Sequence, residues 1–296
     1  MSVDRSTIRE LALDHGLDIV SETIAVNELG LDFQVAIGEA VDGSRWVLRI
    51  PRRPDVVARA AVEGRFLKSI RPHLSIAVPD WQVHSEQLIA YPLLPGSPGL
   101  TIDDRGQPHW HFDVESPAYA ESLAGILAEL HTVDPVLVRP SGIPDLSPAE
   151  VRQRKRDDID RVVTEFAVAS NLRRRWSAWL DDDSYWPTFS TVTHGEVYPA
   201  HQLMDGPITR GVLDWTTASI GDPARDFMFH RASVSAAAFE TTLARYVEAG
   251  GHVWPRFAEH CDELYAATPV ELGLFALHTR EPEHLAAARA QLNPHS

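Results

Sequence analysis

The sequence contains very little cysteine, no long apolar run and no recognisable leader. Cys261 is the only cysteine, so no disulfide can form within the chain, and a reducing cytoplasm is the expected compartment. No stretch approaches the roughly 18 consecutive apolar residues that span a membrane. Residues 1–7 lack the basic segment followed by an apolar run that is typical of a signal peptide. We therefore expect a cytoplasmic protein.

Positive charge is also scarce. Lys and Arg number 27 against 42 Asp and Glu, which gives a net charge of −15. Nucleic acids and anionic membranes both require a positive protein surface, so we expect neither as a partner. A cationic small molecule would suit this charge. The 296 residues are enough for one large domain or two modest ones.

Polar residues able to carry chemistry are concentrated between residues 191 and 226. Apolar residues before His194 and at residues 212–213 predict short buried strands, so the polar residues fall at strand ends and turns. The Asp-Gly-Pro sequence at residues 205–207 predicts a tight turn. The resulting hairpin would bring His201 close to Asp214, with Glu196 next to both.

These residues suit phosphoryl transfer. A carboxylate such as Glu196 can accept or orient a proton, while His201 and Asp214 can hold a divalent ion against nucleotide phosphates. A zinc hydrolase is the alternative, because His194, Glu196 and His201 also suggest a metal cluster. The helical zinc motif, however, places its two His four residues apart, whereas these lie seven apart around Pro199.

Alternating apolar residues between positions 33 and 50 predict an antiparallel β-hairpin. Residues 33–37 form its first strand, the Asp-Gly pair at residues 42–43 forms its turn, and residues 45–50 form the return strand.

Two opposite charges interrupt apolar patterns close to this hairpin. Arg49 lies among apolar residues of the return strand, and Glu63 lies on the apolar stripe of a helix that Pro54 begins. Partly buried charges are costly unless they meet, so we expect an ion pair. Alternatively, Arg49 lies on a solvated edge, and Arg52 and Arg53 are merely loop charges.

A change of composition near residue 95 predicts a domain boundary. Residues 88–94 form a buried strand, and the Pro-Gly-Ser-Pro-Gly sequence that follows is typical of a linker. We therefore divide the chain into residues 1–95, which are rich in strands, and residues 96–296, which are mainly helical.

The segments His194-Gly195-Glu196, His201 and Asp214-Trp215 resemble the catalytic and metal-binding region of the aminoglycoside phosphotransferase family, a protein-kinase-like group. They are most similar to its macrolide 2′-phosphotransferase branch. The family pattern has Asp where this chain has Glu196. At the first metal position most of the family has Asn, whereas the macrolide branch, like this chain, tends to have His. Further similarity to this branch is found at residues 30–35, residues 46–52 and Tyr91-Pro92, so the resemblance covers nearly the whole chain.

The resemblance implies an α+β, bilobal, protein-kinase-like fold with a small β-rich N-lobe and a larger, mainly helical C-lobe. It implies that Glu196 is the catalytic base, and that His201 and Asp214 hold Mg²⁺, or the softer Mn²⁺ that an imidazole would suit. Residues 27–32 would cover the nucleotide. The implied nucleotide contacts are Arg49 with Glu63, and the backbone of a hinge at Ala90, Tyr91 and Leu93.

The implied activity is transfer of the γ-phosphate of GTP or ATP to the 2′-hydroxyl of the desosamine sugar of a macrolide, which would give antibiotic resistance. Desosamine carries a dimethylamine, towards which we expect Asp226 to point. Phe229 would line the substrate cleft or else belong to the core. We expect a monomer that binds small molecules only. The alternatives are a kinase for aminoglycosides or other amino alcohols, and an impaired kinase-like binding module in which Glu196 does not support turnover.

Overall fold

The computed structural model describes residues 3–28, 30–103 and 106–293. Its contacts divide the chain into two compact units. Unit 1 comprises Met1–Phe112, Val136–Ile143 and Pro199–Thr217, and unit 2 comprises Asp113–Pro135, Pro144–Tyr198 and Ala218–Ser296. Unit 1 thus includes segments beyond residue 95, and the boundary at that position stays a prediction.

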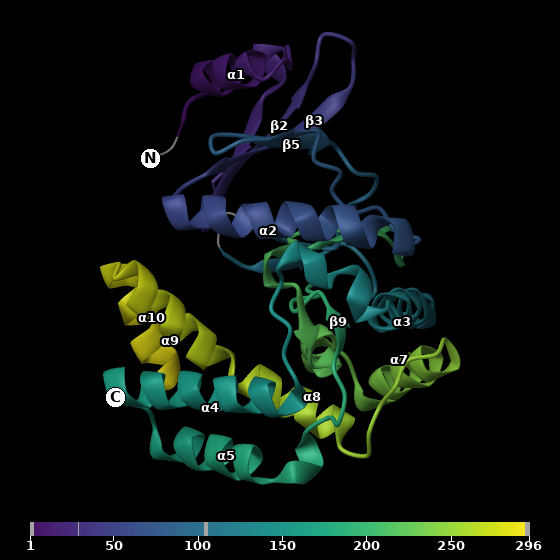
Figure 1. Ribbon diagram of the computed structural model, residues 1–296, viewed down its shortest axis with the longest axis vertical. Helices are drawn as coiled ribbons and strands as arrows, with labels where there is room; N and C mark the ends of the chain where they lie inside the picture. The colour runs from purple at the N-terminus through teal and green to yellow at the C-terminus, as the bar shows by residue number, and fades with distance from the viewer. Residues whose placement is uncertain (1–2, 29, 104–105, 294–296) are drawn as a thin grey trace. The chain divides into compact units, whose positions relative to one another are not determined.

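Unit 1 contains a five-stranded antiparallel sheet (Figure 1). Its strands are β1 (Ala25–Asn27), β2 (Phe33–Glu39), β3 (Arg45–Pro51), β4 (Val83–His84) and β5 (Ile89–Pro92). They are arranged in the order β1-β2-β3-β5-β4. The predicted hairpin is confirmed as β2 and β3, whose register pairs Phe33 with Pro51 and Glu39 with Arg45. Gly43 in its turn has a φ of +85°, which glycine adopts without steric cost.

Two helices of unit 1 cover opposite faces of this sheet. They are α1 (Arg5–Asp14) and α2 (Pro54–Ile70). Leu48 packs in one apolar cluster with Ile8 of α1, whereas Val47 packs in another with Val56 of α2. Because side chains alternate along a strand, Arg49 lies on the same face as Val47, towards α2.

The remaining strands of unit 1 form two small sheets. One contains β6 (Ser97–Pro98), β10 (Gln202–Asp205) and β11 (Ile208–Val212), and the other contains β7 (Leu100–Ile102) and β8 (Pro108–Trp110). β10 and β11 pair as an antiparallel hairpin, with Asp205 opposite Ile208. The tight turn predicted at residues 205–207 is therefore confirmed.

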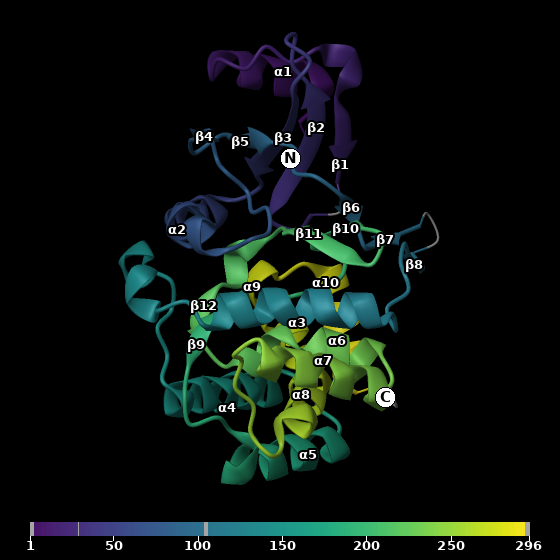
Figure 2. The same ribbon diagram turned by 90° about the vertical axis from the view of Figure 1, so that its right-hand side faces the viewer.

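Unit 2 is mainly helical, with one two-stranded sheet (Figure 2). The sheet pairs β9 (Thr191–Thr193) with β12 (Ser219–Gly221). Its helices are α3 (Pro117–His131), α4 (Pro148–Glu165), α5 (Ser170–Asp181), α6 (Met228–Ser233), α7 (Ala236–Glu248), α8 (Phe257–Ala266), α9 (Thr268–Thr279) and α10 (Pro282–Leu292). α3 packs against α7, and α9 packs against α10. Within the described ranges, no helix combines the length and apolar character that a membrane span requires.

The core of unit 2 contains a buried histidine, His230, whose environment disfavours the protonated, positively charged form of the imidazole. His230 of α6 is 3% exposed, and its Nε2 lies 2.8 Å from Oγ1 of Thr242. The Thr242 hydroxyl donates to the carbonyl of Ala238, so His230 donates through Nε2. Its Nδ1 has no hydrogen-bond partner among the described residues. Burial lowers the pKa of His230 to about 4, against a weaker opposing effect of Glu115.

The buried imidazole predicts a loss of stability in mild acid. Between pH 6.5 and about 4 the unfolded chain binds a proton at His230 that the folded chain rejects. The free energy of unfolding should therefore fall as the pH is lowered through this window, by up to roughly 3 kcal/mol. Urea unfolding of the native protein and His230→Gln from pH 7 to 4.5 checks this, because glutamine keeps a donor without titrating. Parallel pH profiles for the two proteins would contradict the assignment.

Candidate active site

The predicted ion pair between β3 and α2 is present in unit 1. Nη1 of Arg49 lies 3.0 Å from Oε1 of Glu63, and the two residues are 7% and 3% exposed. The guanidinium also lies 4.0 Å from the centre of the Phe33 ring. The pairing is therefore confirmed, and the alternative of a solvated Arg49 is wrong.

A third charge of unit 1 acts on this pair. Burial raises the pKa of Glu63, the charge of Asp214 adds to the increase, and Arg49 opposes it. The negative charges of Glu63 and Asp214 in turn favour the cationic form of Arg49 over the cost of its burial. A buried cation and two carboxylates within electrostatic reach form a strongly polar cluster, which is typical of a functional site.

The hairpin of β10 and β11 brings His201 and Asp214 together, as predicted. Nε2 of His201 lies 3.8 Å from Oδ2 of Asp214, and the backbone amide of Leu213 donates to the carbonyl of His201 at 2.8 Å. Both side chains are partly exposed. The proximity of Glu196 to both stays a prediction, because Glu196 belongs to unit 2.

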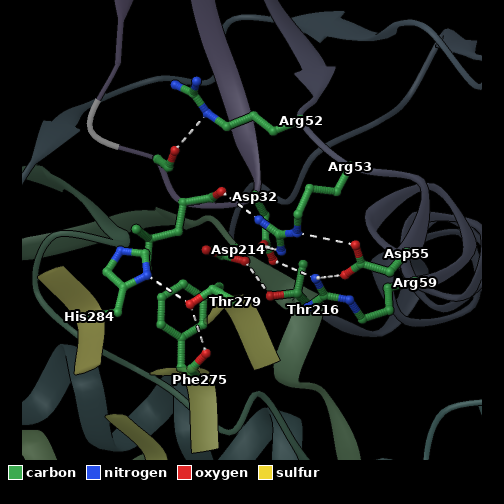
Figure 3. A network of polar contacts seen from close by, with 12 residues as sticks. Asp32, Arg52, Arg53, Asp55, Arg59, Asp214, Thr216, Phe275, Thr279 and His284 are labelled. Carbon is green, nitrogen blue, oxygen red and sulfur yellow. Dashed lines mark hydrogen bonds and ion pairs between the residues drawn. The ribbon is translucent and has the colours of Figure 1, made fainter. Parts of the chain in front are cut away.

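Asp214 has an unusual backbone conformation. Its φ is +60°, in the left-handed region that few residues other than glycine, Asn and Asp adopt. Oγ1 of Thr216 donates to Oδ1 of Asp214 at 2.6 Å, which fixes the carboxylate (Figure 3). Such strained residues often occur at functional sites.

The chemistry of His201 and Asp214 fits a divalent ion that completes its coordination with substrate. Within the described residues, no group of three or more His, Cys, Asp or Glu side chains converges as a closed metal site. Mg²⁺ is usually held by one or two carboxylates together with phosphate oxygens and water, and so requires no closed protein cage. One carboxylate beside one imidazole meets this requirement.

The loop that carries Glu196 is held in unit 2 by a buried carboxylate. Asp226 is completely buried and accepts hydrogen bonds from the amides of His194, at 2.9 Å, and Gly195, at 2.6 Å. Nε2 of His131 approaches the same carboxylate at 3.0 Å. The prediction that Asp226 binds a substrate amine is therefore wrong, because its carboxylate is fully engaged inside the protein. Asp226 instead positions the residues directly before Glu196.

His131 connects the Asp226 carboxylate to Tyr246 of α7. Its Nδ1 lies 2.7 Å from the hydroxyl of Tyr246. Burial opposes the negative charge of Asp226, but the hydrogen bonds from His131 and from the backbone of His194 hold the pKa of Asp226 below its usual value. The sequence does contain a signal for His131, which follows Leu127 by four residues and so lies on the apolar stripe of α3.

Replacing Asp226 with asparagine should destabilise the protein substantially. In Asp226→Asn the new side chain would place an NH₂ group against a backbone N–H and remove the charge that His131 faces. We expect the free energy of unfolding to fall by roughly 3 kcal/mol. Urea unfolding checks this against Asp205→Asn, an exposed carboxylate paired with Arg210. Equal effects of the two substitutions would contradict the assigned role.

Phe229 lies in a row of aromatic rings in unit 2. Its ring centre is 5.2 Å from that of Tyr198 and 6.1 Å from that of Tyr265, which is 46% exposed. Burial raises the pKa of Tyr198, and electrostatic interactions with Tyr265 and Glu196 add to the increase. The row therefore lies within electrostatic reach of Glu196, although Tyr198 was not among the predicted site residues.

The predicted hinge is only partly available to a nucleotide. The carbonyl of Ala90 accepts the amide of Gln82, and the amide of Leu93 donates to the carbonyl of Arg45, at 2.9 and 2.8 Å. The prediction is wrong for the Leu93 amide, which has no second proton to donate, whereas the Ala90 carbonyl has a second lone pair and its contact stays a prediction. Tyr91 is buried, and a purine contact through the remaining hinge groups stays a prediction.

Comparisons with known proteins identify the family and support the fold. Residues 23–260 match the model of the phosphotransferase enzyme family. The crystal structure of macrolide 2′-phosphotransferase MphH from Brachybacterium faecium is 52% identical, with 99% of each chain covered and a TM-score of 0.92. A structure of a macrolide 2′-phosphotransferase type I is 42% identical, with 99% of this chain and 97% of that chain covered and a TM-score of 0.92.

A further relative is YcbJ of Bacillus subtilis (strain 168), an uncharacterized protein. It is 42% identical over 280 residues, which cover 93% of this chain and 91% of YcbJ. The kinase-like α+β fold predicted from the sequence is confirmed by the two structures. The chain therefore belongs to the phosphotransferase enzyme family.

Proposed function

We propose that this protein transfers the γ-phosphate of GTP or ATP to the 2′-hydroxyl of the desosamine sugar of a macrolide antibiotic and thereby confers resistance. The observation that carries the proposal is the 52% identity to a macrolide 2′-phosphotransferase over nearly the whole chain. The pairs Arg49–Glu63 and His201–Asp214, which suit phosphate and metal binding, support it. We propose further that the protein acts as a monomer in the cytoplasm.

The proposed roles follow from the chemistry of the side chains. Glu196 orients the substrate hydroxyl and accepts its proton, from a loop that Asp226 holds in place. Arg49, kept cationic by Glu63, binds phosphate oxygens. His201 and Asp214 hold Mg²⁺, or Mn²⁺, which supplies positive charge to the phosphates when it is bound.

The aromatic row offers a site for the substrate amine in place of Asp226. The dimethylamine of desosamine is protonated near neutral pH, and a cation binds favourably over the faces of Tyr and Phe rings. Tyr198, Phe229 and Tyr265 provide such faces, and the carboxylate of Glu196 adds negative charge. The same features would accept the amine of an aminoglycoside or another amino alcohol, so the substrate has to be identified by experiment.

The proposal is tested by incubating the purified protein with Mg²⁺, GTP or ATP, and erythromycin, followed by mass spectrometry of the drug. We expect the drug to gain one phosphate, and kanamycin incubated in parallel to remain unmodified. Phosphate on kanamycin alone would identify an aminoglycoside kinase instead. If neither drug is modified although calorimetry shows that erythromycin binds, the protein is a binding module in which Glu196 does not support turnover.

A further inference from the structure

The loop between β1 and β2, residues 28–32, contains only one glycine, Gly30. Loops that surround phosphates commonly use several glycines, which let backbone amides approach and point at the anion. A loop with a single glycine must have its peptide groups oriented by other means. The structure shows such a means in the arginines that follow β3.

Arg52 and Arg53 donate to three carbonyls of this loop. Nε of Arg52 lies 3.0 Å from the carbonyl of Gly30, and its Nη2 lies 3.2 Å from the carbonyl of Glu28. Nη1 of Arg53 lies 3.0 Å from the carbonyl of Leu31. Two side chains thus fix three carbonyls within four residues of chain.

Arg53 also connects the loop to the beginning of α2. Arg53 contacts Asp32 through Nη2 at 2.5 Å and Asp55 through Nε at 3.1 Å (Figure 3). Arg59 of α2 pairs with both carboxylates as well, at 2.9 and 3.2 Å. Arg53 keeps the Asp32 carboxylate paired whether or not Arg59 is present. Since α2 also carries Glu63, the loop is connected to the helix that supports Arg49.

The bound carbonyls determine the direction of the loop amides. In a trans peptide the C=O and the N–H point in opposite directions. The peptide groups that contain the carbonyls of Gly30 and Leu31 also contain the amides of Leu31 and Asp32. These two amides therefore point away from the arginines, and in the described part of the chain they have no hydrogen-bond acceptor.

We propose that Arg52 and Arg53 are positioning residues, which hold the amides of Leu31 and Asp32 ready to bind a phosphate oxygen of the nucleotide. Successive backbone amides that are free and point to one side can bind one anion, and here carbonyl contacts replace the usual glycines. This inference rests on the proposed use of a nucleoside triphosphate, but it does not depend on which hydroxyl receives the phosphate.

The test compares Arg52→Ala and Arg53→Ala with Arg59→Ala. Arg59 is the matched control, because it pairs with Asp32 and Asp55 but donates to no loop carbonyl in the described structure. Calorimetry with a non-hydrolysable GTP or ATP analogue and Mg²⁺, without any acceptor, measures nucleotide binding. We expect the Kd to rise about tenfold in Arg52→Ala and Arg53→Ala, and less than about twofold in Arg59→Ala.

Two further readouts separate positioning from general stability. Hydrogen exchange of the amides of residues 30–34 in the nucleotide-free protein should accelerate in Arg52→Ala and Arg53→Ala, while thermal unfolding changes little. In turnover assays the KM for the nucleotide should rise, with kcat and the KM for the acceptor unchanged. If Arg53→Ala does not fold, Arg53→Lys replaces it, because a single ammonium cannot reproduce the planar fork that reaches Leu31, Asp32 and Asp55 together.

Unchanged nucleotide affinity in the loop variants would overturn the inference. An equal loss of nucleotide affinity in Arg59→Ala and in the two loop variants would also overturn it, because the ion pairs and not the carbonyl contacts would then account for the loss. Failure of the native protein to bind the nucleotide would overturn this inference and the proposed function together. Nucleotide binding without phosphate on any drug would overturn only the proposed function.

Discussion

Glu196→Gln is expected to lower kcat about a thousandfold, with little change in the KM for either substrate. Glutamine has nearly the same shape as glutamate, so it should preserve the loop whose backbone Asp226 holds. It cannot accept a proton, however, and its neutral amide orients the substrate hydroxyl poorly. Steady-state kinetics with a macrolide acceptor, at saturating nucleotide and Mg²⁺, measures the effect. Unchanged kcat would show that the base is another group.

Glu196→Asp tests the length of the same side chain. A carboxylate withdrawn by one methylene moves by roughly 1 Å, and a displacement of this size can cost about a hundredfold in rate. We expect kcat to fall by about that factor, to a value between those of the native protein and Glu196→Gln. A faster Asp variant would show that the native carboxylate is poorly aligned, and the role assigned to Glu196 would then be wrong.

Asp214→Asn should lower activity about as much as Glu196→Gln does, because it removes a negatively charged ligand of the proposed metal ion. Asparagine also tolerates the left-handed backbone that Asp214 adopts at φ +60°, and its remaining oxygen can still accept from Thr216. The substitution therefore removes charge with little strain. We expect kcat/KM to fall about a thousandfold. Raising the Mg²⁺ concentration should recover part of this loss.

The matched control for Asp214→Asn is Asp205→Asn, at the exposed turn of the same β10–β11 hairpin. It makes the same chemical change away from the proposed metal ligands, and its activity should stay close to that of the native protein. Native-like turnover in Asp214→Asn, with the same Mg²⁺ dependence, would exclude Asp214 as a ligand.

The parts of the structure that depend on local patterns could be predicted from the sequence. The hairpin of β2 and β3 followed from alternation and an Asp-Gly turn, and the approach of His201 to Asp214 followed from the turn at residues 205–207. The pairing of Arg49 with Glu63 also followed, because each charge interrupted an apolar pattern and burial of either one alone would be costly.

What the sequence could not provide was the direction of side chains whose partners are distant in the chain. The pattern around Asp226 is the same whether its carboxylate faces a substrate or the backbone of residues 194–195, which lie about thirty positions earlier. The partners of His131 could not be predicted for the same reason, since Asp226 and Tyr246 are contributed by other elements. The contacts of Arg52 and Arg53 could not be predicted either, because carbonyl acceptors have no sequence signature.

The most direct test of the account is ³¹P NMR of erythromycin after incubation with the purified protein, Mg²⁺ and GTP or ATP. The account predicts a phosphomonoester whose phosphorus couples to the proton at the 2′ position of desosamine, and only a trace of this product with Glu196→Gln. A spectrum that contains only inorganic phosphate and nucleotide, or a phosphate at another position of the drug, would contradict it.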